Sequence, residues 1–210
     1  MCEKPDIFGF VQAGGASSRF GTDKALAVLG GTTLLARSVE LVASACGNVR
    51  IIAPEGRYAD APAEVLQDRW PGEGPLGGIV TALTETSAKI TRPAWNLIVG
   101  CDLPFLTREW LEYLCERASA SSAEVVFPKS KFGWEPLCAC WSTEGRSELQ
   151  RTFDSGVRKV AEAMKRIRRE VLDESAWKRF DTGERLFWNM NSPADFAEAR
   201  RIIESMPDEQ

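Results

Sequence analysis

The sequence predicts an α/β protein with a doubly wound, mainly parallel β-sheet flanked by helices. Two observations lead to this fold class. Short segments rich in Val, Ile, Phe and Leu, each bounded by turn residues, have the character of buried strands. Amphipathic segments with helical spacing lie between them, and strands that alternate with helices in this way form a mainly parallel sheet.

Six segments have strand character. Five are short apolar runs, and the sixth, EPLCACWS, follows after the pattern loosens near residue 130. The six are residues 6–13, 48–54, 63–68, 95–102, 124–128 and 135–142. In open sheets of this kind a ligand binds beyond the carboxyl ends of the strands. Polar loops that follow the first, third and fourth strands should therefore open on one edge.

Two segments carry an apolar stripe at helical spacing, which is the face that a helix buries. Residues 32–46 repeat apolar side chains at intervals of four, three and four, and residues 107–120 start at Thr107, a suitable N-cap. The stripes consist of Leu35, Val39, Val42 and Cys46 in the first segment, and of Trp110, Leu111, Leu114 and Cys115 in the second.

The last third of the chain contains two further helical regions. Residues 147–167 are helical in pattern but interrupted by a glycine, and the closing helix starts near residue 192. Ser192 as N-cap, Pro193 at the first helical position and Asp195 three residues after the cap form a capping box.

Composition bounds the function. A chain of 210 residues, 44% hydrophobic and 27% charged, fits one globular domain. The net charge of -4 argues against a nucleic-acid partner or an anionic membrane surface. No uncharged apolar run approaches the roughly 20 residues that cross a bilayer, and the N-terminus lacks the features of a secretory signal. We therefore expect a cytoplasmic protein.

The chain contains no histidine. This excludes Ser-His-Asp and Cys-His catalysis and most transition-metal sites, so an enzyme built from this chain is expected to use carboxylates, cations and backbone amides, with or without a hard metal. The six cysteines form no C-x-x-C pair and are expected to be reduced thiols. Cys138 and Cys140 lie in an apolar run, where packing is expected rather than metal binding.

Residues 14–24 form a glycine-rich loop directly after the first strand. Its pattern, G-G-x3-R-x-G-x-D-K, is neither a Walker A motif nor G-x-G-x-x-G. Gly14 and Gly15 allow backbone amides to approach a triphosphate, while Arg19 and Lys24 can neutralise the charge of a departing pyrophosphate. The competing interpretation is a tight turn with cations that face solvent.

Two aspartates end other strands. Asp102, in GCDLPF, can hold Mg²⁺ that bridges phosphate oxygens, or it can cap the turn before Pro104. Asp68 precedes GEGPLGGI, a glycine loop that opens a helix and suits a nucleoside or phosphate. Asp68 can bind ribose hydroxyls or a base edge, or it can be a solvated strand end.

Five motifs together resemble those of molybdenum cofactor guanylyltransferases, also called molybdopterin-guanine dinucleotide synthases, which are nucleotidyltransferases of Rossmann-like fold. The motifs are QAGGASSRFGTDKAL, GPLGGI, CDLPF, EPLCACW and FWNMNSPADF. They occur in that family's order and span nearly the whole chain. The first motif and CDLPF are common to nucleotidyltransferases and indicate the reaction type, whereas EPLCACW with NMNSP favours the molybdopterin branch.

The resemblance implies Mg²⁺-dependent transfer of GMP from GTP to the terminal phosphate of molybdopterin, with release of pyrophosphate. It implies one nucleotidyltransferase domain over residues 1–210, with a nucleotide-binding half over about 1–106 and an acceptor-binding half over about 107–210. Molybdoenzymes and cofactor-biosynthesis proteins are the implied protein partners. The implied nucleotide-binding residues are Ala13, Gly14, Gly15, Lys24, Asp68 and Asp102. The implied catalytic residues are Lys24, Arg19 and Asp102, of which Asp102 is the metal ligand. The implied acceptor-binding residues are Arg158, Asn189 and Asn191.

The residues agree with this chemistry. Attack of a phosphate oxygen on an α-phosphorus needs little general-base catalysis, because that oxygen is already ionised near pH 7. The absence of histidine is therefore compatible with this reaction. What the reaction requires is two anions brought into line, with their repulsion offset by Mg²⁺ and cationic side chains.

Other functions fit parts of the sequence. A related enzyme could use CTP with molybdopterin, or an NTP with a sugar or polyol phosphate. Gln12 stands where the family commonly has leucine, and Pro54 stands where some members have an asparagine that is positioned to bind guanine. These two positions therefore do not decide which nucleotide base is bound. A dinucleotide-binding oxidoreductase would share the alternating strands but would need G-x-G-x-x-G. A nucleotide-binding maturation partner without turnover is a further alternative.

The C-terminal motifs also have structural explanations. The NSPAD segment is a sound helix start in itself. The basic run KRIRR at 165–169 is more typical of the solvated face of a helix than of an anion site. Trp177, Phe187 and Trp188 could stack on a pterin, although at least two of them are expected to pack in the core.

Overall fold

The computed structural model describes residues 6–14 and 23–205, so Gly15 and Arg19 lie outside the described residues. Seven strands form the path β10-β7-β9-β6-β1-β4-β5 of the central sheet, and a short strand, β8, pairs with β7. The strand bounds are β1 Ile7–Gln12, β4 Val49–Ala53, β5 Glu64–Gln67, β6 Trp95–Gly100, β7 Val125–Ser130, β8 Gly133–Trp134, β9 Cys138–Ser142 and β10 Arg169–Leu172.

Most neighbours in this sheet are parallel. β6, β1, β4 and β5 pair in parallel, as do β7 and β10. β9 is antiparallel to both β6 and β7. Because β9 reverses the chain, β7 runs in the same direction as β6, and their carboxyl ends lie at the same edge. The predicted mainly parallel sheet is confirmed.

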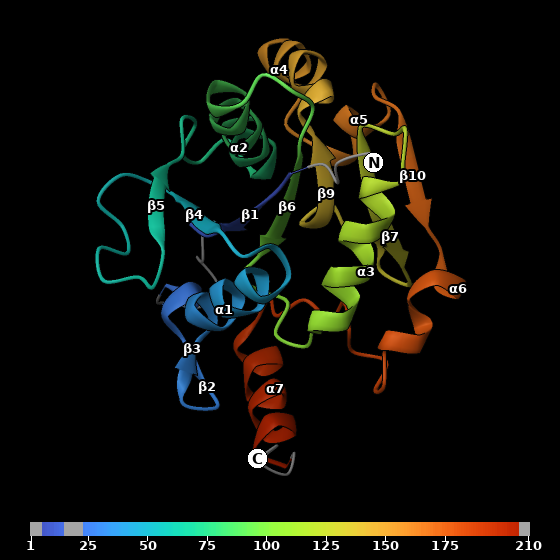
Figure 1. Cartoon of the computed structure of the whole chain (residues 1–210). Helices are drawn as coiled ribbons and strands as arrows, with labels where there is room; N and C mark the ends of the chain where they lie inside the picture. Colours follow the sequence, from blue (N-terminus) through green and yellow to red (C-terminus); the bar gives the residue numbers. More distant parts are fainter. Residues whose placement is uncertain (1–5, 15–22, 206–210) are drawn as a thin grey trace.

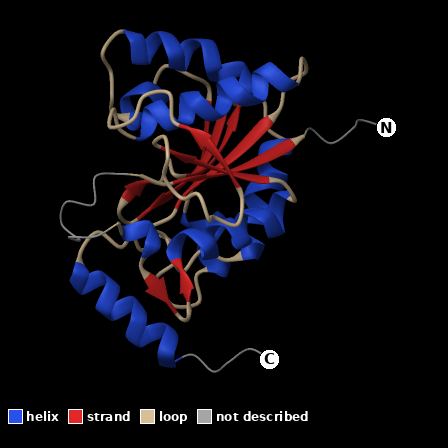
Figure 2. Ribbon diagram, turned by 90° about the vertical axis from the view of Figure 1, so that its left-hand side faces the viewer, coloured by secondary structure: helices blue, strands red, loops and turns tan. Residues whose placement is uncertain are grey.

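Helices cover both faces of the sheet (Figures 1 and 2). On one face, α1 (Leu34–Cys46), α3 (Arg108–Ser119) and α6 (Glu174–Trp177) contribute to one apolar cluster. On the other face, α2 (Pro75–Lys89), α4 (Arg146–Asp154) and α5 (Val160–Met164) contribute to a second. The closing helix, α7 (Pro193–Ser205), packs beside the hairpin of β2 (Val28–Leu29) and β3 (Thr32–Thr33) in a third, smaller cluster. Short 3₁₀ turns occupy Lys24–Leu26, Thr143–Gly145 and Lys178–Phe180.

Strand β6 is buried along its whole length, as expected for a central strand with both faces covered. It nevertheless contains Asn96, whose side chain is fully buried. Thr86 of α2 donates to Asn96 Oδ1 at 2.5 Å, and Asn96 Nδ2 donates to the carbonyl of Trp141 in β9 at 3.1 Å. Since a buried amide is costly unless paired, these bonds fix α2 and β9 against the strand that leads to Asp102.

The predicted helix starts and packing are confirmed. Thr107 Oγ1 accepts a hydrogen bond from the Trp110 amide, and Ser192 and Asp195 form the reciprocal bonds of a capping box. Both cysteines of the C-x-C pair are fully buried, and the Trp110 indole donates to Cys138 Sγ at 3.2 Å. None of the helices in the described ranges is long and apolar enough to span a bilayer.

The basic run at 165–169 differs from the prediction. It leaves α5 through a turn and enters β10, an edge strand, instead of continuing a helix. The missed strand has charged residues at its start, which is common at sheet edges because charge discourages pairing with another chain. Arg168, in the middle of the run, lies within ion-pair distance of Glu124 and Glu144 at the surface.

Candidate active site

The described residues that follow β1, β5 and β6 lie at the carboxyl edge of the sheet, as predicted, and so does the start of the segment after β4. The Ala13 amide donates to the carbonyl of Ile52 in β4 at 2.9 Å, which holds the start of the glycine loop against the neighbouring strand. Gly14 has φ of +108°, and a Cβ on it would lie 2.5 Å from Pro54 Cδ. A residue other than glycine would therefore be strained and would collide with Pro54.

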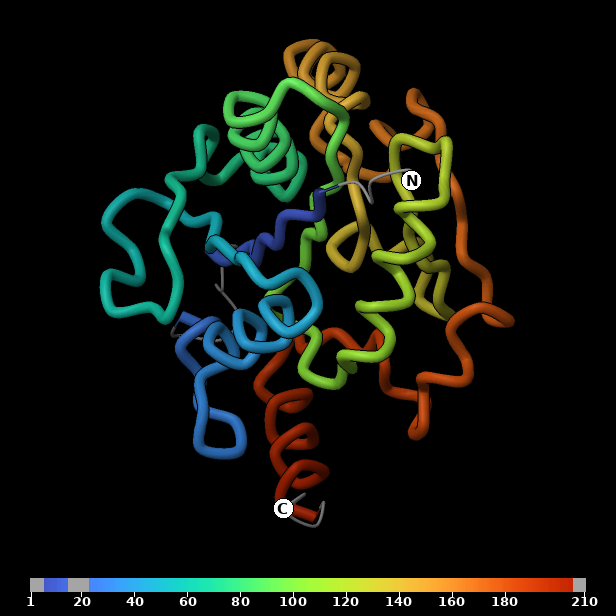
Figure 3. Tube along the Cα trace, in the orientation of Figure 1, coloured from blue at the N-terminus to red at the C-terminus, as the bar shows by residue number. Residues whose placement is uncertain are grey.

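Lys24 and Asp102 are brought together from positions far apart in the sequence. Lys24 Nζ lies 3.0 Å from Asp102 Oδ2 and donates to the carbonyl of Met190 at 2.7 Å. The Met190 amide in turn donates to the Asp102 carbonyl at 2.9 Å, where the chain returns to the end of β6 before it enters α7 (Figure 3). Both charged side chains are largely buried, 16% and 22% exposed, so their charges are only partly screened.

Glu135 adds a second acidic group near this pair. Burial raises the pKa of the Glu135 carboxyl, the hydroxyl of Ser130 donates to it at 2.5 Å, and the negative charge of Asp102 raises the pKa further. Glu135 belongs to the EPLCACW motif, but the motif predicts no role for it. Its place at the start of the predicted strand 135–142 gave no sign of this role, because the approach of Glu135 to Asp102 depends on the β7–β9 connection.

The oxygens around Asp102 fit Mg²⁺. In the described part of the chain no three His, Cys, Asp or Glu side chains form a metal-binding group. Mg²⁺, however, usually binds one or two carboxylates together with substrate phosphates and waters. The Asp102 carboxylate is available for this, and the Oδ1 atom of Asn189, next to Met190, is buried with no hydrogen-bond partner among the described residues. Both are hard oxygen donors.

Asp68 is not a solvated strand end. Its side chain is buried, and Oδ1 accepts hydrogen bonds from the Trp70 amide at 3.0 Å and from the Thr81 hydroxyl of α2 at 3.3 Å. These bonds fasten the end of β5 to α2. Asp68 therefore helps to shape the glycine loop that opens α2.

Gln12, the last residue of β1, lies against the first turn of α2. Its Nε2 donates to the carbonyl of Pro75 at 3.3 Å, while its Oε1 is buried with no partner among the described residues. A Cβ on Gly78 would fall 2.3 Å from Nε2, so the glycine makes room for this amide. Gln12 thus presents an unpaired acceptor beside the glycine loop of α2.

The three predicted acceptor residues do not form one cluster. Arg158 donates to Glu73 at 2.5 Å and to the carbonyl of Phe153 at 2.6 Å, which places it beside the loop that opens α2. In the described residues it makes no contact with the two asparagines. Asn189 is half-buried beside Met190, and Asn191 is exposed, with its amide bound to Asp195 Oδ2 at 2.9 Å.

Two of the three aromatic residues near the C-terminus pack in the core, as predicted. Trp177 and Phe187 are buried, with ring centroids 5.2 Å apart and nearly perpendicular planes. Trp188 is half-buried and stacks on Phe105, with centroids 5.6 Å apart. Phe105 lies in the loop after Asp102, so this stack adds to the contacts that hold the Met190 segment at the end of β6.

The glycine loop and the lysine–aspartate pair at the carboxyl edge define the class of protein: an α/β enzyme that acts on nucleotides. The model of the MobA-like NTP transferase domain matches residues 9–169. The chain belongs to this family and is a nucleotidyltransferase.

Relatives cover nearly the whole chain. The probable molybdenum cofactor guanylyltransferase of Deinococcus radiodurans is 37% identical over 190 residues, 90% of this chain and 91% of the relative. The molybdenum cofactor guanylyltransferase of Rhodopseudomonas palustris is 30% identical, with 99% and 97% covered. These matches confirm the resemblance found in the motifs.

Solved structures share the fold. The crystal structure of molybdopterin-guanine dinucleotide biosynthesis protein A from Archaeoglobus fulgidus superposes with a TM-score of 0.79 at 25% identity, over 95% of this chain and 100% of that one. The 2-C-methyl-D-erythritol 4-phosphate cytidylyltransferase of Thermus thermophilus has a TM-score of 0.64 at 15% identity, covering 92% and 98%, which shows the common fold alone.

Proposed function

We propose that this protein transfers GMP from GTP to the terminal phosphate of molybdopterin and releases pyrophosphate. The observation that carries the proposal is the Lys24–Asp102 pair, held at the carboxyl edge of the sheet beside a glycine loop. The guanylyltransferases among the relatives support the choice of GTP and molybdopterin.

The chain's own residues provide positioning and charge. The acceptor phosphate is already ionised, so its oxygen can attack the α-phosphorus without a histidine base. Asp102 would hold Mg²⁺, with the buried Asn189 Oδ1 as a further oxygen donor, and the metal would supply charge neutralisation for the triphosphate. Lys24, fixed by the Met190 carbonyl, holds positive charge at the same edge. We assign Arg19 to the pyrophosphate, as its place in the loop suggests.

The remaining assignments follow the two halves of the chain. Ala13, Gly14, Gly15 and Asp68 would bind the nucleotide in the half comprising residues 1–106. Arg158, Asn189 and Asn191 would bind the acceptor in the half comprising residues 107–210. Arg158 can do so only from the side of the α2 loop, where its contacts place it. We place the reaction in the cytoplasm, with cofactor-biosynthesis proteins or molybdoenzymes as partners.

Pyrophosphate release tests the proposal. The purified chain is incubated with molybdopterin and Mg²⁺, and with GTP, CTP, ATP or UTP in parallel. Asp102→Asn removes the metal ligand, and Asp60→Asn is the matched control at an exposed position. We expect release with GTP, lost in Asp102→Asn and kept in the control. A preference for CTP would refute the base assignment, and no release with any nucleotide would refute molybdopterin as the acceptor.

A further inference from the structure

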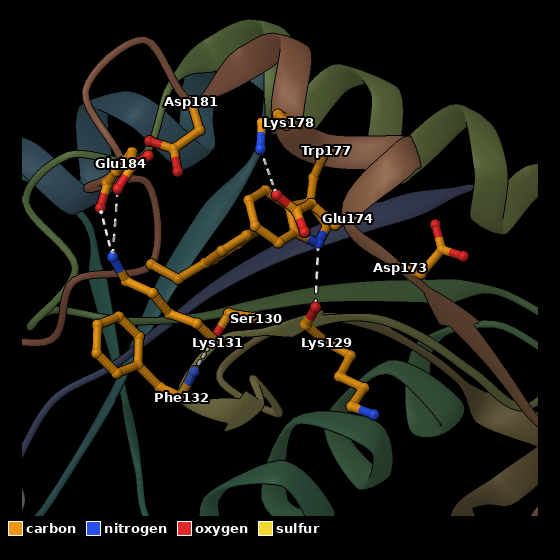
Figure 4. Close-up of a pocket in the computed structure, with 11 residues that line it drawn as sticks. Lys129, Ser130, Lys131, Phe132, Asp173, Glu174, Trp177, Lys178, Asp181 and Glu184 are labelled. Carbon is orange, nitrogen blue, oxygen red and sulfur yellow. Dashed lines mark hydrogen bonds and ion pairs between the residues drawn. The ribbon is translucent and has the colours of Figure 1, made fainter.

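A pocket of about 370 Å³ lies beyond the carboxyl end of β7, and the reaction described above gives it no part. Its walls come from the turn between β7 and β8, from α6 and from the segment 181–187 (Figure 4). Phe132 lines it together with the edge-to-face pair of Trp177 and Phe187. Phe132 is 63% exposed, more than any other large apolar side chain of the described residues, and gives the pocket an accessible aromatic wall.

Most polar groups of the pocket are already engaged. Asp173 caps α6, and Asp181 accepts hydrogen bonds from two backbone amides of the following turn at 2.7 and 2.9 Å. Glu174 is paired with Lys178 at 2.5 Å. Glu184 differs from these acids. Its carboxylate is 85% exposed and, among the described residues, has only a 3.9 Å contact with Lys131.

Glu184 and Lys131 therefore place an acceptor and a donor side by side at the pocket. Glu184 has φ of +55°, a conformation that non-glycine residues rarely adopt, and the Asp181 turn holds it there. Lys131 Nζ lies 3.5 Å from the Glu184 carbonyl and 5.4 Å from the centroid of the Phe132 ring. Phe132, Lys131 and Glu184 thus border one end of the pocket, with the ammonium over the aromatic ring and next to the carboxylate.

We propose that this pocket binds the fused 2-amino-4-oxopyrimidine ring of the acceptor, which is the pterin end of the molecule. The inference rests on the proposed function, because it locates one end of the acceptor named there. The amino group and neighbouring ring N–H are donors that a carboxylate accepts together, and the ring carbonyl accepts from an ammonium. The ring face stacks on Phe132.

The guanine of GTP carries the same hydrogen-bonding edge, so position must decide between the two. The glycine loops for the nucleotide follow β1 and β5, whereas the pocket follows β7. Phe187 of the pocket precedes Met190 by three residues, a span of at most about 11 Å, and the Met190 carbonyl contacts Lys24. A pterin in the pocket can therefore direct its phosphate toward the Lys24–Asp102 pair.

Binding of a simple pterin tests this assignment. Equilibrium dialysis of the full chain against 6-hydroxymethylpterin, detected by the fluorescence of the pterin, gives the affinity. Phe132→Ala removes the stacking surface and Glu184→Gln the charged acceptor. Val28→Ala and Glu204→Gln are matched controls at an exposed apolar and an exposed acidic position. We expect about tenfold weaker binding in each pocket variant, unchanged binding in the controls, and no displacement by excess GTP.

The transfer reaction gives a second readout. The pocket variants should raise the KM for molybdopterin about tenfold while kcat and the KM for GTP stay the same. Displacement of the pterin by GTP, unchanged affinity in both pocket variants, or no pterin binding by the unaltered chain would overturn the inference. Failure of the proposed function has a different signature, because the unaltered chain would then bind the pterin and release no pyrophosphate with molybdopterin.

Discussion

The two regions along the carboxyl edge of the sheet hold their functional side chains in different ways. Beside β6, Lys24 and Asp102 bind each other and the backbone of Met190, so three distant segments fix one cluster of charge. Beside β7, the pocket has aromatic walls, and most of its acids are bound locally to backbone amides or to neighbouring side chains. The first region is suited to stabilising negative charge on phosphates, and the second is suited to binding a flat ring between aromatic side chains.

Removing Lys24 should give the largest effect. In Lys24→Met the site loses its fixed cation and Asp102 loses its ion-pair partner, so we expect kcat/KM to fall by about 10²–10³. Steady-state pyrophosphate release measures this. Lys89→Met is the matched control, because Lys89 is paired with Glu85 on the surface of α2. A loss of activity shared by both variants, or a loss of folded structure in Lys24→Met, would contradict a role for Lys24 in the site.

Gly14→Ala should destabilise the chain by about 2–3 kcal/mol, since left-handed backbone strain adds to a collision with Pro54. Gly31→Ala separates the two causes, because Gly31 also has positive φ but nothing lies within 4 Å of its added Cβ. We expect the control to lose about 1 kcal/mol from strain alone. Urea unfolding of both variants compares them. Equal losses would show that the approach of Gly14 to Pro54 costs nothing.

The first region was largely predictable from sequence, and the second was not. Gly14 follows one apolar run that has the length and composition of a strand, Asp102 ends another, and Lys24 closes the loop that Gly14 begins. Parallel strands bring such ends to one edge, so the placement of these residues follows from topology. Phe132 and Glu184, by contrast, lie in turns 52 residues apart in sequence. Their meeting depends on β10 and α6, a short edge strand and a single turn of helix.

The same limit explains Arg158 and Glu135. A loose motif alignment grouped Arg158 with the C-terminal asparagines, but the end of α4 and its contact with Glu73 carry it to the α2 loop. Glu135 had no distinctive spacing, and only the reversal of the chain into β9 brings it near Asp102. The position of a side chain in a loop or an antiparallel connection cannot be predicted from the sequence, because no periodic pattern determines it.

Glu135 tests the electrostatics of the first region. Its pKa is raised in the folded chain, so the folded state prefers the protonated acid, and stability falls as pH rises from the unfolded pKa through the folded pKa. Glu135→Gln removes this penalty and should stabilise the chain by about 1 kcal/mol at pH 8. The gain should shrink as pH approaches 4, and it should be smaller in an Asp102→Asn background because the repelling charge is absent there. A gain independent of pH would refute the electrostatic explanation.

The smallest effect is expected where the two regions join, at the start of α7. The amides of Asn191 and Ser192 donate to Asp195 Oδ2, and these bonds hold the pKa of Asp195 below its usual value. A lowered folded pKa gives stability that is present above the unfolded pKa of about 3.9 and lost as pH falls through the folded value.

Asp195→Ala should therefore cost about 0.5–1 kcal/mol at pH 7 and progressively less below pH 4, as measured by urea unfolding across that range. Glu198→Ala, in the next turn of α7, is the matched control, since in the described part of the chain Glu198 pairs with Arg201 on the helix surface. The capping box also fixes Asn191 and Ser192, which directly follow Met190 in the chain. Asp195→Ala should for that reason raise the KM for molybdopterin more than the KM for GTP, whereas equal changes in the two constants would place the effect on the fold as a whole.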